Sequence, residues 1–429
     1  MKNNNKILKT SFIAILLTYL FNFSFSQDTI KILTYNLLNF NNITQNCNES
    51  NNPILTKVNS LTKILNYTKP DIIGLNEIGS NEETLNILKN QVLNKIDGKN
   101  YSLINYISPN SNITNVLIYN NKKFILDTFI IIPTPIRETI YAKLFYNSPD
   151  LQLGDTVFIQ PIVTHLKAGS SLEDQEKRNQ QTEVLMNNLS NLKYKKNLIL
   201  MGDLNVYSST EQCFQNLINY PVTEIKFFDP INKLGNWHNN QNYALYHTQS
   251  TRLNSNDCFS GGGLNDRFDF ILLSFHIINN TNKVSYVSNS YKTLGQDGYR
   301  FNQELIYPIN YSEPHDIIDA LYQLSDHLPV TLKLVIHQTP YYKVNHNYLQ
   351  NELCSIYYYN NSLNVNCDIF QSNNTNLEIF DVSGKSIFKK TIHTINSENF
   401  KIPIHLKKGI YILKISNLNY NITNKLIVN

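Results

Sequence analysis

Apolar and polar positions between residues 30 and 336 follow two alternating spacings. Short apolar runs of strand length are "IKILTYNLLNF" (30–40), "DIIGL" (71–75), "NLILMGDLNV" (197–206), "FDFILLS" (268–274) and "LPVTLKLVI" (328–336). Stretches with helical spacing separate these runs. In one of them, Ile54, Val58 and Leu61 recur on a single face until Pro70 ends the pattern. The region therefore predicts strands that alternate with helices.

Further elements complete this pattern. We expect a helix over about residues 82–96, and several β-branched and aromatic strands between 101 and 165. Ser170 and Glu173 resemble a capping box that opens a charged helix reaching about Asn191. Strands and helices mixed in this way predict an α/β sandwich of mostly mixed sheets.

The texture changes after residue 337. Runs such as "LEIFDVSGKSIFKKTI" and "LKKGIYILKISNLNYNITNKLIVN" alternate like strands joined by Gly or Asn turns, with almost no helical periodicity. Residues 338–429 therefore predict a separate all-β domain, and residues 27–337 a larger α/β domain.

The first 26 residues have the pattern of a secretory signal peptide. Lys2, Lys6 and Lys9 precede the apolar stretch "SFIAILLTYLFNFSF", and Ser24 and Ser26 are small residues suited to a cleavage point. A membrane anchor is the alternative. Because Thr18 and Asn22 interrupt the stretch and no basic cluster follows it, we favour cleavage and export, with no integral membrane segment left afterwards.

Export changes the charge that matters. The chain has 37 basic and 33 acidic side chains, and loss of the three leader lysines leaves a net charge of +1. Residues 340–429 hold nine Lys, no Arg and five acids, so residues 27–339 carry about −3. This balance weakens the case for a protein that grips long nucleic acid through many phosphates, without excluding it.

Five cysteines in an exported chain allow disulfides and leave at least one thiol over. A two-residue turn at Asn360-Asn361 would place Cys354 opposite Cys367 in a hairpin, close enough for a disulfide. Cys213 and Cys258 are a second candidate pair. Reduced, buried thiols are the alternative for both pairs.

Five polar clusters interrupt apolar runs at predicted strand ends. They are Asn36, Glu77, His165 with Lys167, Asp203 with Asn205, and Asp326 with His327. A buried polar group without a partner is costly, and convergence at one edge of a sandwich would supply the partners. Taken singly, each cluster also has a structural interpretation, as a turn cap or a buried histidine.

The residue types limit the chemistry. Carboxylates without cysteine are hard ligands suited to Mg²⁺, with Mn²⁺ or Ca²⁺ as alternatives, and Glu77 with Asp326 could hold such an ion. The two histidines and Asp203 could activate water, while Asn36 and Asn205 could donate to phosphoryl oxygens. No Gly-x-Ser-x-Gly motif occurs. The set therefore predicts metal-assisted attack of water on a phosphoester.

The ordered motifs "TYNLLNF", "LNEIGS", "VTHLKAG", "MGDLNV", "DRFDFILLS" and "SDHLPV" resemble the endonuclease/exonuclease/phosphatase superfamily over about residues 30–336. The resemblance implies a four-layered α/β sandwich, in which two mixed sheets are flanked by helices, and a metal-dependent phosphodiesterase. Asn76, where many members have Gln, and Leu204, in place of an aromatic residue, depart from the pattern without removing a charge.

The resemblance also implies roles. Glu77 corresponds to the metal-binding Glu, with Asn36 and Asp326 near metal and phosphate. Asp203 and Asn205 correspond to the pair that orients water, and His327 to the general base. His165 corresponds to a second histidine, Asp269 to the residue that orients one of the two, and Arg137 to a phosphate contact in a stretch that lacks the usual Pro.

The C-terminal region resembles the sorting domain of the Bacteroidetes-type secretion system, through "LEIFDVSGK", "LKKGIYILKI" and "NKLIVN". This implies contact with secretion machinery and a secreted or surface-attached product. An accessory or carbohydrate-binding β-sandwich is the alternative.

We expect a monomeric extracellular nuclease. A sphingomyelinase-like or inositol-phosphate phosphoesterase is one alternative, and a catalytically inactive surface scaffold is another. Trp237, Tyr243 and Tyr246 could stack bases, but "NYALYH" is better explained as a half-buried strand. Residues 294–323 are expected to form a loop and a helix beside the site.

Overall fold

The computed structural model describes residues 27–148, 151, 156–337, 354–359, 361–367, 375–392, 399–416 and 421–428. The chain divides into two units, Met1–Tyr341 and Tyr342–Asn429. The leader expected over residues 1–26 lies outside the described residues. Across the described part of the chain, no helix combines the length and the apolar character needed to span a membrane.

The first unit holds a seven-stranded mixed sheet. Its order is β11-β13-β1-β2-β4-β3, with β12 beside β13. The strands are β1 (Gln27–Phe40), β2 (Ile72–Gly79), β3 (Tyr101–Leu103), β4 (Ile113–Asn120), β11 (Val284–Tyr286), β12 (Lys292–Thr293) and β13 (Val330–His337). β1 runs parallel to β2 and antiparallel to β13, so one sheet contains both kinds of pairing.

A six-stranded sheet packs against the first one. Its order is β5-β6-β7-β8-β10-β9. The strands are β5 (Phe124–Ile132), β6 (Thr139–Tyr146), β7 (Phe158–His165), β8 (Leu198–Asp203), β9 (Phe227–Phe228) and β10 (Asp269–Ser274). β7 and β8 are parallel, while β10 is antiparallel to β8.

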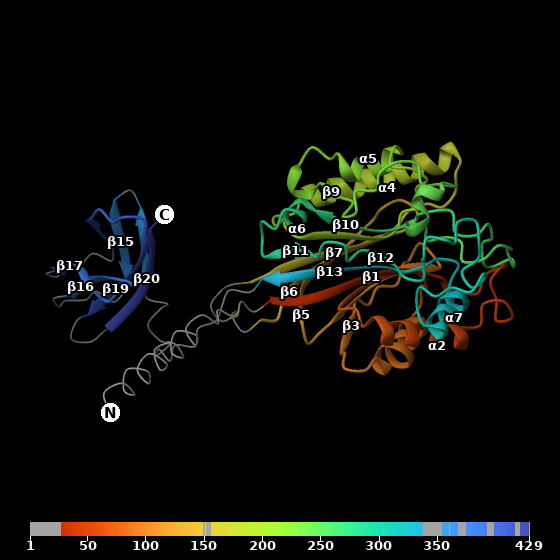
Figure 1. The fold of residues 1–429 in the computed structure, drawn as a ribbon, viewed down its shortest axis with the longest axis horizontal. Helices are drawn as coiled ribbons and strands as arrows, with labels where there is room; N and C mark the ends of the chain where they lie inside the picture. Colours follow the sequence, from red (N-terminus) through yellow and green to blue (C-terminus); the bar gives the residue numbers. More distant parts are fainter. Residues whose placement is uncertain are drawn as a thin grey trace, which may run out of the picture. The chain divides into compact units, whose positions relative to one another are not determined.

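Helices cover the outer face of each sheet (Figure 1). They are α2 (Ile54–Thr68), α3 (Glu82–Ile87) and α7 (His315–Leu324) on the first sheet, and α4 (Leu172–Ser190) and α5 (Gln212–Ile218) on the second. The short helix α6 (Phe275–Ile278) follows β10, and its Ile277 packs in the core between the sheets. In β1, Ile30 and Ile32 enter the core between the sheets, whereas Leu33 and Tyr35 enter the core beneath α2 and α7. A third core lies between the second sheet and α4 and α5. The predicted four-layered sandwich is confirmed.

Two predicted elements differ in detail. The helix cap is Ser171, which accepts from the backbone N–H of Asp174, so the Ser170–Glu173 capping box is wrong by one residue. "NYALYH" is not a strand: Gln241–Tyr246 form a 3₁₀ helix. The side chain of Asn240 caps this helix at the backbone N–H of Asn242, which stabilises a turn in place of sheet pairing.

The second unit is a small sandwich of antiparallel sheets, and its fold is the predicted all-β one. One sheet contains β14 (Cys354–Tyr359), β15 (Ser362–Cys367) and β18 (Asn399–Pro403); the other contains β16 (Thr375–Asp381), β17 (Ser386–Ile392), β19 (Gly409–Ser416) and β20 (Asn421–Val428). Side chains from both sheets share one core. Cys354 faces Cys367 in the predicted register. Their side chains lie outside the described part, so the disulfide between them stays a prediction.

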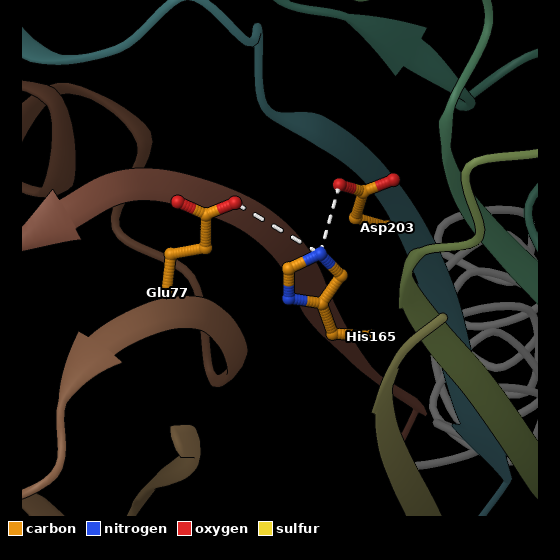
Figure 2. A group of neighbouring side chains, drawn as sticks. All are labelled: Glu77, His165 and Asp203. Atoms are coloured by element: carbon orange, nitrogen blue, oxygen red, sulfur yellow. Dashed lines mark ion pairs between the residues drawn. The ribbon is translucent and has the colours of Figure 1, made fainter. Parts of the chain in front are cut away.

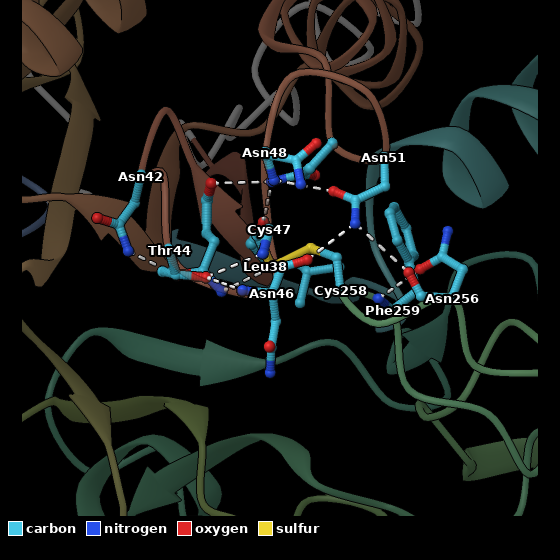
Figure 3. The surroundings of a disulfide bond; sticks show 12 residues. Leu38, Asn42, Thr44, Asn46, Cys47, Asn48, Asn51, Asn256, Cys258 and Phe259 are labelled. Carbon is cyan, nitrogen blue, oxygen red and sulfur yellow. Dashed lines mark hydrogen bonds between the residues drawn. A yellow bond between two sulfur atoms is a disulfide. The ribbon is translucent and has the colours of Figure 1, made fainter.

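A disulfide joins Cys47 to Cys258 across 211 residues, with their Cα atoms 4.6 Å apart (Figure 3). The predicted Cys213–Cys258 pair is therefore wrong. Cys213 is a buried free thiol in α5, where it packs against the second sheet, and burial raises its pKa to about 12. Cys258 instead packs with Cys47, Leu38 and Phe259. The disulfide ties the loop after β1 to the loop that precedes β10.

Replacing Cys47 and Cys258 together with serine is expected to lower the free energy of unfolding by about 2 to 5 kcal/mol, because the crosslink closes a very long loop in the unfolded chain. Urea unfolding of the oxidised protein and of the double variant measures the loss. Under reducing conditions the wild-type protein and the double variant should unfold at the same midpoint. Equal midpoints for the oxidised wild type and the variant would contradict the prediction.

Candidate active site

The residues predicted for the site gather at one end of both sheets. Asn36 and Glu77 come from the adjacent parallel strands β1 and β2. His165 and Asp203 are the last residues of β7 and β8 and lie opposite each other in register. Asp269 opens β10 directly opposite Asp203. Register within each sheet, together with the packing of the two sheets against each other, therefore brings together side chains that are more than 200 residues apart in the sequence.

Gly202 allows β7 and β8 to approach closely at the site. Its φ is +141°, and a Cβ built there would lie 1.9 Å from the backbone oxygen of Thr164. Any larger residue would force the strands apart. Glycine at this position is needed for the pairing of His165 with Asp203.

Asn36 connects two carboxylates. Its Nδ2 donates to Glu77 Oε1 and to Asp203 Oδ2, at 3.0 Å in each case, while its Oδ1 accepts from the backbone N–H of Leu38. The backbone N–H of Asn39 donates to Glu77 Oε2 at 3.1 Å. Glu77 adopts the left-handed backbone conformation, with a φ of 59°, which is uncommon for a residue with a side chain and concentrates at functional sites.

His165 lies between these carboxylates (Figure 2). Its Nε2 is 3.4 Å from Asp203 Oδ2 and 3.9 Å from Glu77 Oε1. Burial, together with the charges of Arg137 and His327, lowers the pKa of His165 well below its usual value. The imidazole is therefore neutral near pH 7. Burial raises the pKa of Asp203 to about 7, because the ionised carboxylate loses its hydration.

Asp269 contacts His327 and not His165. The sequence had left open which of these two histidines Asp269 orients. His327 Nδ1 is 2.7 Å from Asp269 Oδ2, and both side chains are buried. His327 Nε2 lies 3.8 Å from Asp203 Oδ2. Burial disfavours the charged imidazole, but Asp269 and Asp203 outweigh it and raise the pKa of His327 well above 6.5. The three residues form a buried carboxylate–imidazole–carboxylate group.

Asp326 borders this group from the segment before β13. Its Oδ2 accepts from the backbone N–H of Ser260 at 3.0 Å and from Gln249 Nε2 at 3.3 Å. Its Oδ1 is buried with no hydrogen-bond partner among the described residues. A carboxylate oxygen in this situation needs a donor or a cation.

Asn205 and Arg137 complete the predicted set. The backbone N–H of Asn205 donates to Asp203 Oδ1 at 3.0 Å, and its side chain donates to the backbone oxygen of Leu166. Arg137 Nη1 donates to the same oxygen of Leu166 at 3.0 Å. Burial lowers the pKa of Arg137, although Glu77 and Asp203 act in the opposite direction. Arg137 therefore lies within electrostatic reach of the acidic side chains.

Lys57 braces the site and was missed in the sequence. It is buried in α2, and its Nζ donates to the backbone oxygens of Leu37, Leu38 and Leu324, each at 2.7 Å. It thus ties the end of β1 to the segment that carries Asp326. Burial lowers its pKa to about 7. Its burial could have been inferred from its position in the sequence. Lys57 lies three residues after Ile54 and four before Leu61, on the apolar face of the helix.

Gln249 was also missed, and Asn76 was noted only as a departure from the family pattern, without the role that it has here. Gln249 Nε2 lies 2.8 Å from His327 Nε2. The Oδ1 of Asn76 accepts from the backbone N–H of Asp203 at 3.0 Å, which fixes the end of β8. Gln249 lies in a loop with no motif of its own, and no local pattern marked it.

The donor set fits a hard divalent cation. Glu77, His165 and Asp203 form one group whose candidate ligand atoms lie within 4.8 Å of one another, and Asp203, Asp269 and His327 form a second. Asp326 belongs to neither group, although its unpartnered Oδ1 can accept a cation. Carboxylate oxygens dominate the set, as Mg²⁺, Mn²⁺ and Ca²⁺ require.

The family model described as "Endonuclease/Exonuclease/phosphatase family" matches residues 33–327, and this range contains all of the candidate site residues. The chain belongs to this family. It is accordingly a hydrolase of phosphoester bonds, and its family depends on divalent metal ions.

Solved structures of family members are distantly similar to this chain. The endonuclease/exonuclease/phosphatase from Beutenbergia cavernae is 14% identical, covers 93% of this chain and 100% of its own, and has a TM-score of 0.43. The human Nocturnin catalytic domain with bound sulfate is 18% identical over 72% of this chain and 97% of its own, with a TM-score of 0.44. D. rerio TDP2 complexed with a single-strand DNA product is 14% identical over 72% and 99%, also with a TM-score of 0.44. No curated protein matches the sequence.

The C-terminal region also matches a family model. Residues 359–429 match the "Secretion system C-terminal sorting domain". The β-strands from β15 to β20 fall in this range. This confirms the resemblance predicted for the C-terminal region, and it makes the chain a secreted or surface protein that engages secretion machinery.

Proposed function

We propose that this family member is a secreted nuclease that hydrolyses phosphodiester bonds in DNA or RNA with water as the nucleophile. The observation that carries the proposal is the contact of 2.7 Å between His327 and Asp269, beside Asp203 and within a buried carboxylate cluster. An imidazole held by a carboxylate is well suited to act as the general base of a hydrolysis, and this contact supplies that pair.

His327 is the proposed base. Asp269 Oδ2 accepts the N–H of His327 Nδ1. This leaves Nε2 of His327 to take a proton from the attacking water. Gln249 Nε2 lies 2.8 Å from the same Nε2, beside the nitrogen that takes the proton. The water oxygen forms a bond to phosphorus as the bond from phosphorus to the leaving oxygen breaks. The leaving oxygen then takes a proton from solvent water, and protonated His327 returns its own proton to solvent.

The remaining polar residues have roles in orienting the water and the phosphate. Asp203 and Asn205 orient the water and support the developing charge. Neutral His165 and the Arg137 guanidinium contact phosphoryl oxygens. Asn36 positions Glu77 and Asp203 through its two donated hydrogen bonds.

Glu77 and Asp326, together with Asn36, are the residues proposed to hold a divalent cation, with Mg²⁺ as the first choice. When bound, such an ion neutralises phosphate charge and polarises the phosphoryl group. The unpartnered Oδ1 of Asp326 supports this assignment.

A substrate panel tests the proposal. The full chain is incubated with plasmid DNA, an RNA oligomer, sphingomyelin and phosphorylated inositols, in Mg²⁺ and in excess chelator. We expect cleavage of the nucleic acids in Mg²⁺ and none with chelator. Turnover of sphingomyelin or inositol phosphates alone would replace the nuclease with the corresponding phosphoesterase.

A further inference from the structure

A polar pocket of about 710 Å³ lies beside the candidate active site. Its walls come from loops that are continuous with three site residues. Ser170 follows His165 by five residues, Tyr207 follows Asn205 by two, and Asp266 precedes Asp269 by three. The pocket is therefore built on the same strand ends as the site, and its size is that of a ligand pocket.

Gln249 links one wall of this pocket to the proposed base. Its backbone exchanges hydrogen bonds with Asp266, at 3.0 and 3.1 Å. Its side-chain Nε2 lies 2.8 Å from His327 Nε2. One residue thus spans the distance between the pocket wall and the reaction centre.

The lining of the pocket is polar and provides little charge to a ligand. Hydroxyl and amide groups come from Ser170, Gln175, Ser208, Thr210 and Asn236. None of the described residues that line it is a lysine or an arginine.

Glu211 is the one carboxylate of the lining apart from Asp266. Its negative charge is already paired inside the protein. It pairs with the fully buried Arg178 at 2.7 Å and accepts from the backbone N–H of Tyr207 at 2.7 Å. Such a lining suits neither a second phosphate group nor an acyl chain. It suits an uncharged ring with hydrogen-bonding edges.

His238 and Asp266 form the most specific part of the lining. His238 Nδ1 is 2.7 Å from Asp266 Oδ1, and the two side chains are 48% and 12% exposed. Tyr207 packs against the His238 ring in a T-shaped contact, with 5.0 Å between centroids. The other ring nitrogen of His238, Nε2, has no hydrogen-bond partner among the described residues. Asp266 thus holds an imidazole in place, with one nitrogen left to meet a ligand.

We propose that this pocket binds the nucleoside attached to the scissile phosphate, and that His238 hydrogen-bonds to that nucleoside. This inference rests on the proposed nuclease function and adds the group by which a nucleic acid is selected over a phospholipid. Tyr207 supplies an aromatic surface beside the base or sugar.

The test compares two substrates in the full chain. One is a short single-stranded thymidine oligonucleotide, and the other is bis(p-nitrophenyl) phosphate, which has a scissile phosphodiester and no nucleoside. In His238→Ala, the ratio of kcat/KM for the oligonucleotide to kcat/KM for the aryl ester should fall about tenfold, mainly through KM. His315→Ala, which replaces an 80% exposed histidine in α7, should leave the ratio unchanged.

A second variant makes the test independent of His238. Thr210 is exposed on the pocket wall, so Thr210→Trp fills the pocket without disturbing the core and should lower the ratio as well. Wild-type ratios in both variants would overturn the pocket proposal alone. A wild-type protein that hydrolyses the aryl ester but no oligonucleotide would overturn the nuclease function itself.

Discussion

Replacing His327 with asparagine is expected to lower kcat by about 10²- to 10⁴-fold while the protein stays folded, because the variant loses the proposed base and keeps a donor to Asp269. The side-chain amide of asparagine reaches about as far as Nδ1 of histidine. Steady-state hydrolysis of DNA in Mg²⁺ measures the change, and thermal unfolding checks the fold. A kcat close to that of the wild type would refute His327 as the base.

His327→Ala is the informative contrast. It also removes the base, but it leaves the fully buried Asp269 without the imidazole that now contacts its Oδ2. An uncompensated buried charge is strongly destabilising. We therefore expect alanine to lose both activity and stability, whereas asparagine loses activity alone.

The pH profile separates the role of Asp269 from simple structural damage. Asp269 and Asp203 raise the pKa of His327, so the base loses its proton only above its usual pH, and activity should increase with pH through that range. Asp269→Asn removes one of these negative charges. The acidic limb of the kcat profile should then move to lower pH, while kcat at its maximum falls because the imidazole is less well oriented. An acidic limb at the wild-type pH would show that His327 does not determine it.

Replacing Glu77 with glutamine is expected to raise the Mg²⁺ concentration needed for half-maximal activity by at least about tenfold. The change removes the charge of a proposed hard ligand and keeps its volume, and even outer contacts of a metal site are worth about 10- to 100-fold. Titration of activity with Mg²⁺, and calorimetric titration with Mn²⁺, measure the shift.

Glu83→Gln is the matched control. Glu83 is exposed in the first turn of α3, so the same chemical change there should leave both titrations unaltered. A Glu77→Gln protein that titrates like the wild type would move the cation to other residues, with Asp203 and Asp326 as the next to examine.

The convergence of the site residues could be predicted because they lie at or near the ends of strands. Asn36, Glu77, His165, Asp203 and Asp269 occupy strand positions that are marked by a polar residue in an apolar run. Parallel pairing of β1 with β2, and of β7 with β8, carries such ends to the same edge. The partner of Asp269 could not be predicted, since it depends on how the segment before β13 lies against β10.

Contacts between loops could not be predicted either. Cys47 and Cys258 lie in irregular segments, and the sequence near them has no periodicity from which to infer a register. The hydrogen bonds of Lys57 could not be predicted for a related reason. Its three acceptors are backbone oxygens, which exist at every position and leave no mark in a sequence. Pairs of side chains on regular strands could be predicted from the sequence, whereas contacts to the backbone of loops could not.

Gly202 has a further consequence for how this enzyme can change. Because a single methyl group at that position would wedge the strands that carry His165 and Asp203, the spacing of the two side chains cannot be tuned separately from the architecture of the sheet. Variation in reactivity must therefore come from the surrounding loops, which tolerate replacement. The junction of β7 and β8 stays constant and fixes the distance between His165 and Asp203.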